Sequence, residues 1–443
     1  MLLLFVMVRL PIIRGLVLVP MKVWSWVVGA LALAAVGTAA GFGIAAQREL
    51  ASLEHAPAYS LTAPPPLLAP AQGSDIDEQL LIDALTPAAS NPDLGTFHAR
   101  ISSVNTGEVV LDRNADVPLR PASVTKILTS AAALYQLGPE DTLPTAVVRG
   151  AEPGEVTILA GGDVWLDADA LDDLAAQMQG EEVSSVTIDT SLWEGFTEFP
   201  ETWDPENIDA GYVAPLQPAM LSGGRMDGNT EGDVPRSHTP ALEVAQALAN
   251  RLGAEHAAVA DGPSPADAQV LASVESPTLT ERMRVMMRNS DNVYAETIGR
   301  EVALARGTTD APQAVLDTLA EHGLDLSGTE LADCSGLSDT NRIAPALLDT
   351  VLMQATTEAP LRYLLDTLPV AAGEGTLETR YEDLPGRGWV RAKTGTLDET
   401  SALAGTVTSE AGNVYTFAFI SNDSSILEAR RGMDELASIL RDF

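Results

Sequence analysis

Two residues three positions apart, Ser123 and Lys126, could form a nucleophile and its base. The chain has 26 basic residues, of which only Lys22, Lys126 and Lys393 are lysines. Unlike arginine, lysine can lose its proton when its surroundings disfavour the charge. Residues three apart lie on one face of a helix, so the amine of Lys126 would lie near the hydroxyl of Ser123. Such a pair can make a serine nucleophilic without a histidine.

Two further triplets make this interpretation more specific. Ser290-Asp291-Asn292 and Lys393-Thr394-Gly395 follow Ser123-Val124-Thr125-Lys126 in this order. Each triplet alone is also typical of an ordinary structural role, because Ser, Asp and Asn cap helices and glycine is common in turns. Together, S-x-x-K, S-D-N and K-T-G are the set of motifs that β-lactamases and penicillin-binding proteins carry. We interpret Asp291 itself as structural.

The three motifs predict one set of catalytic residues. We expect Ser123 to attack a carbonyl carbon, Lys126 to take the proton of the hydroxyl, and Ser290 to pass a proton to the leaving amine. Lysine has a reference pKa of about 10.4, so a base that works near neutrality needs a pKa about three units lower. Burial, the positive end of a helix and a second ammonium on Lys393 would each lower the pKa of Lys126.

Five residues are expected to bind the substrate, namely Asn292, Lys393, Thr394, Gly395 and Thr396. The amide of Asn292 offers both a donor and an acceptor to a substrate amide. Lys393 and the two threonine hydroxyls would bind a terminal carboxylate. Gly395 lacks a side chain, so a substrate could lie beside its strand. The backbone N–H groups of Ser123 and Thr396 would form an oxyanion hole.

The composition argues against several other classes of protein. A formal net charge of −36 repels phosphate backbones, so nucleic acid is not expected as a partner. The one cysteine, Cys334, cannot form an internal disulfide or a cysteine-built zinc site. Neither H-E-x-x-H nor G-x-S-x-G occurs, which argues against metalloproteases and α/β-hydrolases. No metal ion or other cofactor is expected.

The N-terminal part of the chain predicts attachment to a membrane or export. Residues 23–46 carry no charge, and as a helix of about 36 Å they would span a hydrocarbon core of about 30 Å. Basic residues precede this segment, so the positive-inside rule places the rest of the chain outside the cytoplasm. We expect 1–22 to be a cytoplasmic extension or the product of a mis-assigned start, 23–46 an anchor or signal peptide, and 47–74 a Pro/Ala-rich linker.

The rest of the chain predicts one domain inserted into another. Strand patterns occur near both of its ends, at 96–104, 108–111, 389–396, 402–408 and 414–420. We expect these strands to form one antiparallel sheet in a catalytic domain made of 75–146 and 262–443. Residues 147–261, with short strands and loops rich in Gly, Pro and Asp, are predicted to form an inserted small α/β domain. Helical patterns over 278–305 and 311–322 predict that the second motif lies on a turn between or within helices.

The chain resembles the class C low-molecular-mass penicillin-binding proteins, the D-alanyl-D-alanine carboxypeptidases/endopeptidases. The resemblance covers about residues 85–443 and extends beyond the three motifs. The further similar segments are Gly161-Gly162-Asp163, Asp333-Cys334-Ser335-Gly336-Leu337-Ser338, Asn341-Arg342, Gly373-Glu374-Gly375-Thr376-Leu377 and Leu403-Ala404-Gly405. Cys334 is a departure, because the family usually has glycine there. The resemblance implies an α+β penicillin-recognising transpeptidase/β-lactamase-like fold, an antiparallel sheet flanked by helices beside a helical lobe.

The resemblance also implies a substrate and a reaction. Ser123 would be acylated by a peptidoglycan stem peptide ending in D-Ala-D-Ala, or by a β-lactam antibiotic. The predicted protein is therefore a serine D-Ala-D-Ala carboxypeptidase that is extracytoplasmic, attached to the cell membrane or secreted to the cell wall. A D,D-endopeptidase acting on peptidoglycan cross-links, a β-lactamase or esterase, and a non-catalytic wall-binding protein remain the alternatives.

Overall fold

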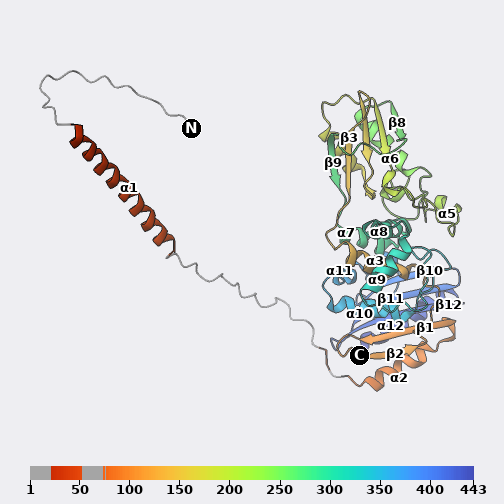
Figure 1. Ribbon diagram of the computed structural model, residues 1–443. Helices are drawn as coiled ribbons and strands as arrows, with labels where there is room; N and C mark the ends of the chain where they lie inside the picture. The colour runs from red at the N-terminus through yellow and green to blue at the C-terminus, as the bar shows by residue number, and fades with distance from the viewer. Residues whose placement is uncertain (1–20, 52–72, 75) are drawn as a thin grey trace. The chain divides into compact units, whose positions relative to one another are not determined.

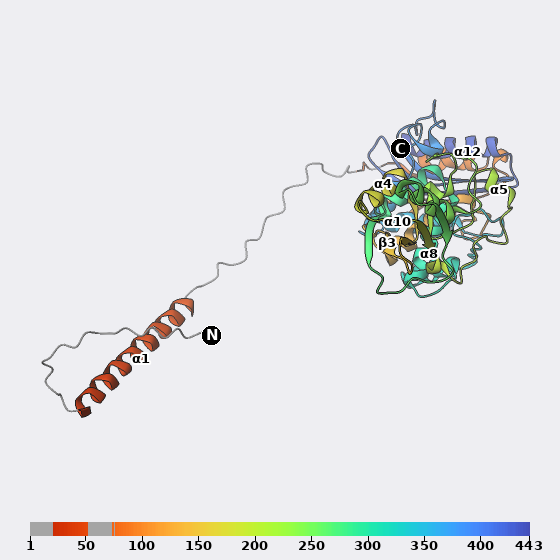
Figure 2. The ribbon, with the colours of Figure 1, turned by 90° about the horizontal axis from the view of Figure 1, so that it is seen from above.

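The computed structural model describes residues 21–51, 73–74 and 76–443, and the chain divides into two units (Figures 1 and 2). The described part of the N-terminal unit is helix α1 (Met21–Ala51). The second unit, Pro70–Phe443, contains the other helices and all the strands of the described residues. Most of the predicted extension 1–22 and of the predicted linker 47–74 lies outside the described residues.

Helix α1 contains the apolar segment predicted at 23–46. Its stretch Trp26–Arg48 has a mean hydropathy of 2.0 and, with 23 residues, is long enough to cross a membrane. None of its most apolar window is buried against protein. A membrane anchor and a signal sequence near the N-terminus share this length and composition, so α1 fits both predicted roles.

Strands from both ends of the second unit form one antiparallel sheet with the order β10-β11-β12-β1-β2. The bounds are β1 Thr96–Ser103, β2 Val109–Arg113, β10 Val390–Leu397, β11 Thr400–Thr408 and β12 Val414–Asn422. The first strand of this unit, β1, pairs with its last strand, β12, so that Thr96 lies opposite Asn422. This arrangement confirms the predicted antiparallel sheet and leaves β10, with the third motif, at one edge.

Helices cover both faces of this sheet (Figure 1). They are α2 (Glu78–Ala89), α10 (Pro345–Thr357) and α12 (Ile426–Ile439). Phe417 and Phe419 of β12 are buried with apolar residues of α2 and α12. Ala418 and Ile420, which alternate with them, are buried with residues of α10 and of further helices. Because successive side chains of a strand point to opposite faces, β12 has the apolar pattern of a central strand that is buried on both sides.

The helical lobe carries the first two motifs. Its helices are α3 (Lys126–Gln136), α7 (Leu279–Asn289), α8 (Asn292–Ala305), α9 (Ala311–Glu321) and α11 (Arg362–Thr367). Helix α8 is buried continuously from Val293 to Ala303, so it forms the centre of the lobe. The second motif lies on the turn between α7 and α8, as predicted. Figure 1 shows this lobe between the main sheet and a second sheet.

Five strands in and next to the predicted insertion form a second sheet with the order β8-β6-β4-β3-β9. The bounds are β3 Pro144–Arg149, β4 Glu155–Leu159, β6 Ser185–Asp189, β8 His256–Val259 and β9 Val270–Glu275. Strands β4, β6 and β8 are parallel, and β3 is antiparallel to both β4 and β9. The sheet therefore extends beyond the predicted range 147–261 at both ends, because β3 and β9 pair with each other.

Helices and a small parallel pair of strands complete the inserted part. They are α4 (Ala168–Gln177), α5 (Glu206–Asp209), α6 (Pro240–Leu252), β5 (Asp163–Leu166) and β7 (Ala219–Leu221). Apolar residues of α4 and α6 are buried in one cluster with those of β4 and β6. This α/β layer agrees with the expected fold class. The domain boundaries themselves stay a prediction.

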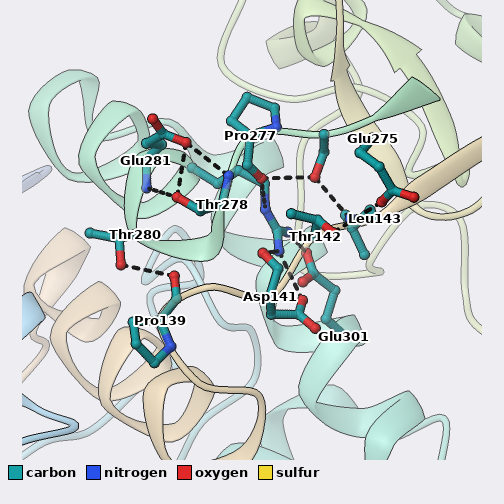
Figure 3. Close-up of polar contacts among 12 residues, drawn as sticks. Pro139, Asp141, Thr142, Leu143, Glu275, Pro277, Thr278, Thr280, Glu281 and Glu301 are labelled. Carbon is teal, nitrogen blue, oxygen red and sulfur yellow. Dashed lines mark hydrogen bonds and ion pairs between the residues drawn. The ribbon is translucent and has the colours of Figure 1, made fainter.

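Hydrogen bonds connect the second sheet to the helical lobe, and Figure 3 shows Asp141, Glu301, Thr280 and Pro139 among the residues of this connection. Arg282 is fully buried and donates to Glu301 at 2.5 Å and to Asp141 at 3.1 Å. Nearby, the hydroxyl of Thr280 donates to the carbonyl of Pro139 at 3.0 Å. These contacts link the chain that enters β3 with the chain that leaves β9. We infer that the second sheet is attached through a connection stabilised by hydrogen bonds.

Candidate active site

Ser123 lies in a short 3-10 helix, Ala122–Thr125, that leads directly into α3. The backbone of Ala122 has a φ of 50°, in the left-handed region that is costly for a residue with a side chain. The hydroxyl of Thr125 holds this turn by donating to the carbonyl of Ala122 at 2.9 Å. In a 3-10 helix residues three apart are eclipsed, and Nζ of Lys126 lies 3.0 Å from Oγ of Ser123.

The amine of Lys126 is enclosed by acceptors from three parts of the chain. Besides Ser123, it donates to Oδ1 of Asn292 at 2.9 Å and to the carbonyl oxygen of Ser335 at 2.7 Å. Lys126 is fully buried, and this burial lowers the pKa of its ammonium to about 8. The carboxylates of Asp333, Asp291 and Glu296 oppose the lowering of this pKa. Burial, one of the three effects considered from the sequence, is thus the main cause of the lowered pKa of Lys126.

The second motif presents its serine to the other buried lysine. Ser290 ends α7 with a φ of 56°, and its hydroxyl accepts from Nζ of Lys393 at 2.8 Å. Lys393 also donates to the carbonyl of Thr394 at 2.8 Å. Burial and the charge of Lys126 hold the pKa of Lys393 well below its usual value. The charge of one amine therefore lowers the pKa of Lys393, whereas the sequence led us to expect that it would lower the pKa of Lys126.

Asp291 is held by two buried arginines. Its Oδ2 accepts from Arg225 at 2.6 Å and from Arg236 at 2.7 Å, and all three side chains are buried. Its Oδ1 accepts from the backbone N–H of Tyr294 at 3.0 Å and so caps α8. Although burial opposes it, the two guanidinium groups hold the pKa of Asp291 down at about 2. The predicted structural role of Asp291 agrees with these contacts.

Strand β10 passes close to the turn that carries Ser123. A Cβ atom at Gly395 would lie 2.7 Å from the carbonyl oxygen of Pro121 and 3.1 Å from Cβ of Ala122. A side chain there would push the strand away from the turn. Close packing of β10 against this turn is therefore a second reason for glycine at position 395. The sequence had suggested only that glycine leaves room for the substrate.

The threonines of β10 have partners that the sequence did not indicate. The hydroxyl of Thr394 donates to Oγ1 of Thr376 at 2.8 Å. The hydroxyl of Thr396 accepts from Nη2 of Arg430 on α12 at 2.6 Å. Nε of Arg430 is buried without a hydrogen-bond partner. An unpredicted guanidinium therefore lies beside the predicted carboxylate-binding residues.

Hydrogen bonds bring the predicted residues together in two connected groups. Lys126 joins Ser123 to Asn292, and Lys393 joins Ser290 to β10. Ser290 and Asn292 lie two positions apart on one turn, so the two groups share that turn. The role of each residue stays a prediction, including the oxyanion hole formed by the N–H groups of Ser123 and Thr396.

Sequence reasoning missed two residues behind Lys126. Ser335 contributes a backbone carbonyl, an atom that every residue has, so its side chain gave no signal. Glu296 accepts from the backbone N–H of Ser335 at 2.8 Å. Its spacing of four residues from Asn292 on α8 was the available signal, because such residues lie on one helix face.

Cys334, the departure from the expected glycine, fits into the lobe. Its thiol lies against α8, where a Cβ atom at Gly299 would come within 2.3 Å of its Sγ. Its backbone N–H donates to Glu296 at 3.0 Å, and its carbonyl accepts from Thr129 at 2.6 Å. Gly299 thus supplies the space that the cysteine needs.

The chain is similar to known proteins. The family model described as the D-Ala-D-Ala carboxypeptidase 3 (S13) family matches residues 81–235 and 226–442. The chain is 44% identical to Carboxypeptidase DacB of Mycolicibacterium smegmatis, over 82% of this chain and 84% of that protein. It is 41% identical to Carboxypeptidase Rv3627c of Mycobacterium tuberculosis, over 81% and 82% of the two chains.

A solved structure supports the fold. Penicillin binding protein 4 (dacB) from Haemophilus influenzae superposes with a TM-score of 0.67 and 22% identity, covering 81% of this chain and 97% of that chain. Bd3459, a predatory peptidoglycan endopeptidase from Bdellovibrio bacteriovorus, gives a TM-score of 0.54 at 17% identity, covering 78% and 92%. At these identities the structures support the predicted fold and nothing finer.

Proposed function

Because the chain belongs to the D-Ala-D-Ala carboxypeptidase 3 (S13) family, we propose that it is a serine D-Ala-D-Ala carboxypeptidase with Ser123 as its nucleophile. The observation that carries this assignment is the 3.0 Å contact between Nζ of Lys126 and Oγ of Ser123. Burial lowers the pKa of Lys126 to about 8, so about a tenth of the amine is neutral at pH 7, compared with less than about one in a thousand for an exposed lysine. A neutral amine at hydrogen-bond distance can take the hydroxyl proton.

The first half of the reaction forms an acyl-enzyme. Oγ of Ser123 attacks the carbonyl carbon of the penultimate D-Ala, and its proton passes to Nζ of Lys126. The C–N bond of the tetrahedral intermediate then breaks. The departing amine nitrogen of the terminal D-Ala takes the hydroxyl proton of Ser290, whose oxygen accepts from Nζ of Lys393 at 2.8 Å. The proton that Lys126 accepted replaces the one lost by Ser290, so Lys126 is neutral again. The Ser123 ester remains, and one D-alanine leaves.

The second half returns the free enzyme. A water molecule attacks the ester carbonyl, Lys126 takes one of its protons, and that proton returns to Oγ of Ser123 as the C–O bond breaks. The stem peptide leaves with a new C-terminal carboxylate. The N–H groups of Ser123 and Thr396 would stabilise the oxyanion in both halves.

Cationic and hydroxyl groups at β10 support binding of a terminal carboxylate. Lys393, Thr394 and Thr396 are the predicted binding residues, and Nη2 of Arg430 lies 2.6 Å from the hydroxyl of Thr396. An approaching carboxylate would raise the pKa of Lys393 and so favour its charged form. A carboxypeptidase needs this recognition, because its substrate ends in a free carboxylate.

The same groups make β-lactams expected inhibitors. A β-lactam presents an acyl carbonyl and a carboxylate, and it would acylate Ser123 in place of the stem peptide. The decisive experiment is incubation with labelled penicillin followed by mass mapping. We expect the label on Ser123 and its loss in Lys126→Ala, while a label on any other residue overturns the mechanism. Release of D-alanine from a D-Ala-D-Ala peptide tests the carboxypeptidase, and turnover of purified cross-linked muropeptides tests the endopeptidase alternative.

The apolar helix α1 supports an extracytoplasmic location. Its stretch Trp26–Arg48 is long and apolar enough to cross a membrane. We propose that it anchors the protein and that the catalytic unit lies outside the cytoplasm, where peptidoglycan stem peptides are found. Protease treatment of intact spheroplasts tests this, because an external catalytic unit is digested and a cytoplasmic one is protected.

A further inference from the structure

One buried carboxylate beside the proposed base has no part in the reaction described above. Glu296 lies on α8, four residues after Asn292, and only 5% of it is exposed. Its Oε1 accepts from the backbone N–H of Cys334 at 3.0 Å and of Ser335 at 2.8 Å. Burial of a carboxylate destabilises the folded protein unless the carboxylate accepts such hydrogen bonds.

The two N–H groups that Glu296 holds belong to the loop that binds Lys126. The carbonyl oxygen of Ser335 accepts from Nζ of Lys126 at 2.7 Å. Another acceptor, Oδ1 of Asn292 at 2.9 Å, lies one turn before Glu296 on α8. Glu296 therefore fastens the Ser335 carbonyl to the helix that also carries Asn292.

We propose that Glu296 is a positioning residue for Lys126. Glu296 holds the Ser335 carbonyl in place, and its negative charge sets the pH range in which Lys126 is neutral. The inference rests on the proposed function, since it takes Lys126 as the base. The two effects are separable, because a glutamine oxygen can accept the same two hydrogen bonds without the charge.

The other two carboxylates around Lys126, Asp291 and Asp333, have partners of their own that do not bind Lys126. Asp291 pairs with Arg225 and Arg236. Asp333 accepts from several groups of its own loop and its surroundings, namely the N–H groups of Gly336 and Ser338, the amide of Asn341 and the indole of Trp203. Lys393 is the other amine near Lys126.

Glu296 itself has less compensation. Burial and the charge of Asp333 raise its pKa to about 7, and the thiol of Cys334 lies beside it. Arg300 faces the same region, but its guanidinium donates to the carbonyls of Leu216 at 3.3 Å and Thr197 at 2.6 Å. The carboxylate of Glu296 raises the pKa of Lys126, after those of Asp333 and Asp291, and it is the one that also fastens the Ser335 carbonyl.

The test is the rate of Ser123 acylation by labelled penicillin, measured from pH 5.5 to 10 with the full chain. In Glu296→Gln the loss of negative charge lowers the pKa of Lys126. We expect the rise of the rate with pH to move to lower pH by on the order of one unit. In Glu296→Asp the charge remains but the shorter side chain cannot reach both N–H groups. We expect the plateau rate to fall about tenfold or more, with a midpoint above that of Glu296→Gln.

Glu301 supplies the matched control. It lies on the same helix, is also buried, and pairs with Arg282 instead of the Lys126 loop. Glu301→Gln makes the same chemical change, and we expect its pH midpoint to equal that of the unmodified protein. Thermal unfolding of each variant identifies any that do not fold.

The outcomes separate this inference from the proposed function. If the unmodified protein is acylated on Ser123 but Glu296→Gln leaves the midpoint unchanged, the inference is wrong and the proposed function stands. An equal shift in Glu301→Gln also overturns it, because the effect is then not specific to the Lys126 loop. If the unmodified protein is never acylated, the proposed function itself fails.

Discussion

Nζ of Lys126 lies 3.0 Å from Oγ of Ser123 and 2.9 Å from Oδ1 of Asn292, a residue 166 positions further along the chain. One buried amine thus joins the serine of the first motif to the asparagine of the second. Burial disfavours the charged amine, while the three acceptors favour it. The balance of these effects determines the reactivity of Ser123 in the proposed mechanism.

We predict that Lys126→Arg strongly slows acylation although it retains the positive charge. Arginine cannot be deprotonated in a protein, so the base is lost although the cation remains. The acylation rate with labelled penicillin should fall about 10²- to 10⁴-fold. Lys22→Arg in α1 makes the same change outside the site and should leave the rate unaltered. Acylation of Lys126→Arg at the original rate would show that another group takes the proton.

The pH dependence of acylation follows from the same amine. Burial lowers the pKa of Lys126 to about 8, and only the neutral form can accept the proton. The neutral fraction therefore rises with pH, about tenfold per unit below the pKa, and levels off above it. The acylation rate should rise from pH 6 and reach a plateau near pH 9. A rate that is constant over this range would contradict the assignment of Lys126 as the base.

Removal of the Asp291 carboxylate should destabilise the fold. Asp291→Ala leaves the buried guanidinium groups of Arg225 and Arg236 without their partner, which typically costs about 3–5 kcal/mol. Urea unfolding measures the loss of stability. Asp172→Asn removes an exposed partner of Arg251, and it should change the unfolding free energy by about 0.5 kcal/mol or less.

The stabilisation by Asp291 has a defined pH window. Its pKa is about 2 in the folded protein and about 3.9 in an unfolded chain, so the unfolded state binds the proton more readily. The contribution of Asp291 is therefore complete above about pH 4 and is lost as the pH falls through about 2. The difference in stability between the unmodified protein and Asp291→Ala should shrink over this acid range.

Glycine at position 395 should be required for activity because of packing. A Cβ atom there would lie 2.7 Å from the carbonyl oxygen of Pro121, so Gly395→Ala must move β10 or the turn before Ser123. We expect acylation to slow about tenfold or more, since small displacements at a reacting centre are costly. Gly262→Ala is the control, because no atom lies within 4 Å of the added Cβ. Equal rates in both variants would refute this role.

Arg430 should contribute to recognition of the substrate carboxylate. Its Nη2 donates to the hydroxyl of Thr396 at 2.6 Å. Arg430→Gln removes the positive charge, and we expect KM for a D-Ala-D-Ala peptide to rise about tenfold while kcat changes little. A peptide amide, which lacks the terminal carboxylate, should be affected much less. A fall in kcat alone would assign Arg430 to another step.

Much of the fold could be predicted because its signals are local. Alternating residues such as Phe417 and Ala418 point to opposite faces of a strand, so the sequence indicates a buried strand without its partners. The turn at Ser290 was predictable in the same way, since the helical patterns on either side are interrupted there. The extent of the second sheet was not predictable, because the pairing of β3 with β9 joins segments more than a hundred residues apart.

The sequence by itself determined the identity and order of the residues proposed to react. The chain has three lysines, and all its other basic residues are arginines. Two of the lysines, Lys126 and Lys393, lie in the motifs and so already indicated amines that can lose a proton. Only the tertiary structure decided what surrounds them, namely the Ser335 carbonyl and the Glu296 carboxylate behind Lys126. The physical reason is that a pKa depends on burial and on nearby charges, and both are set by residues that chain folding brings together from distant positions.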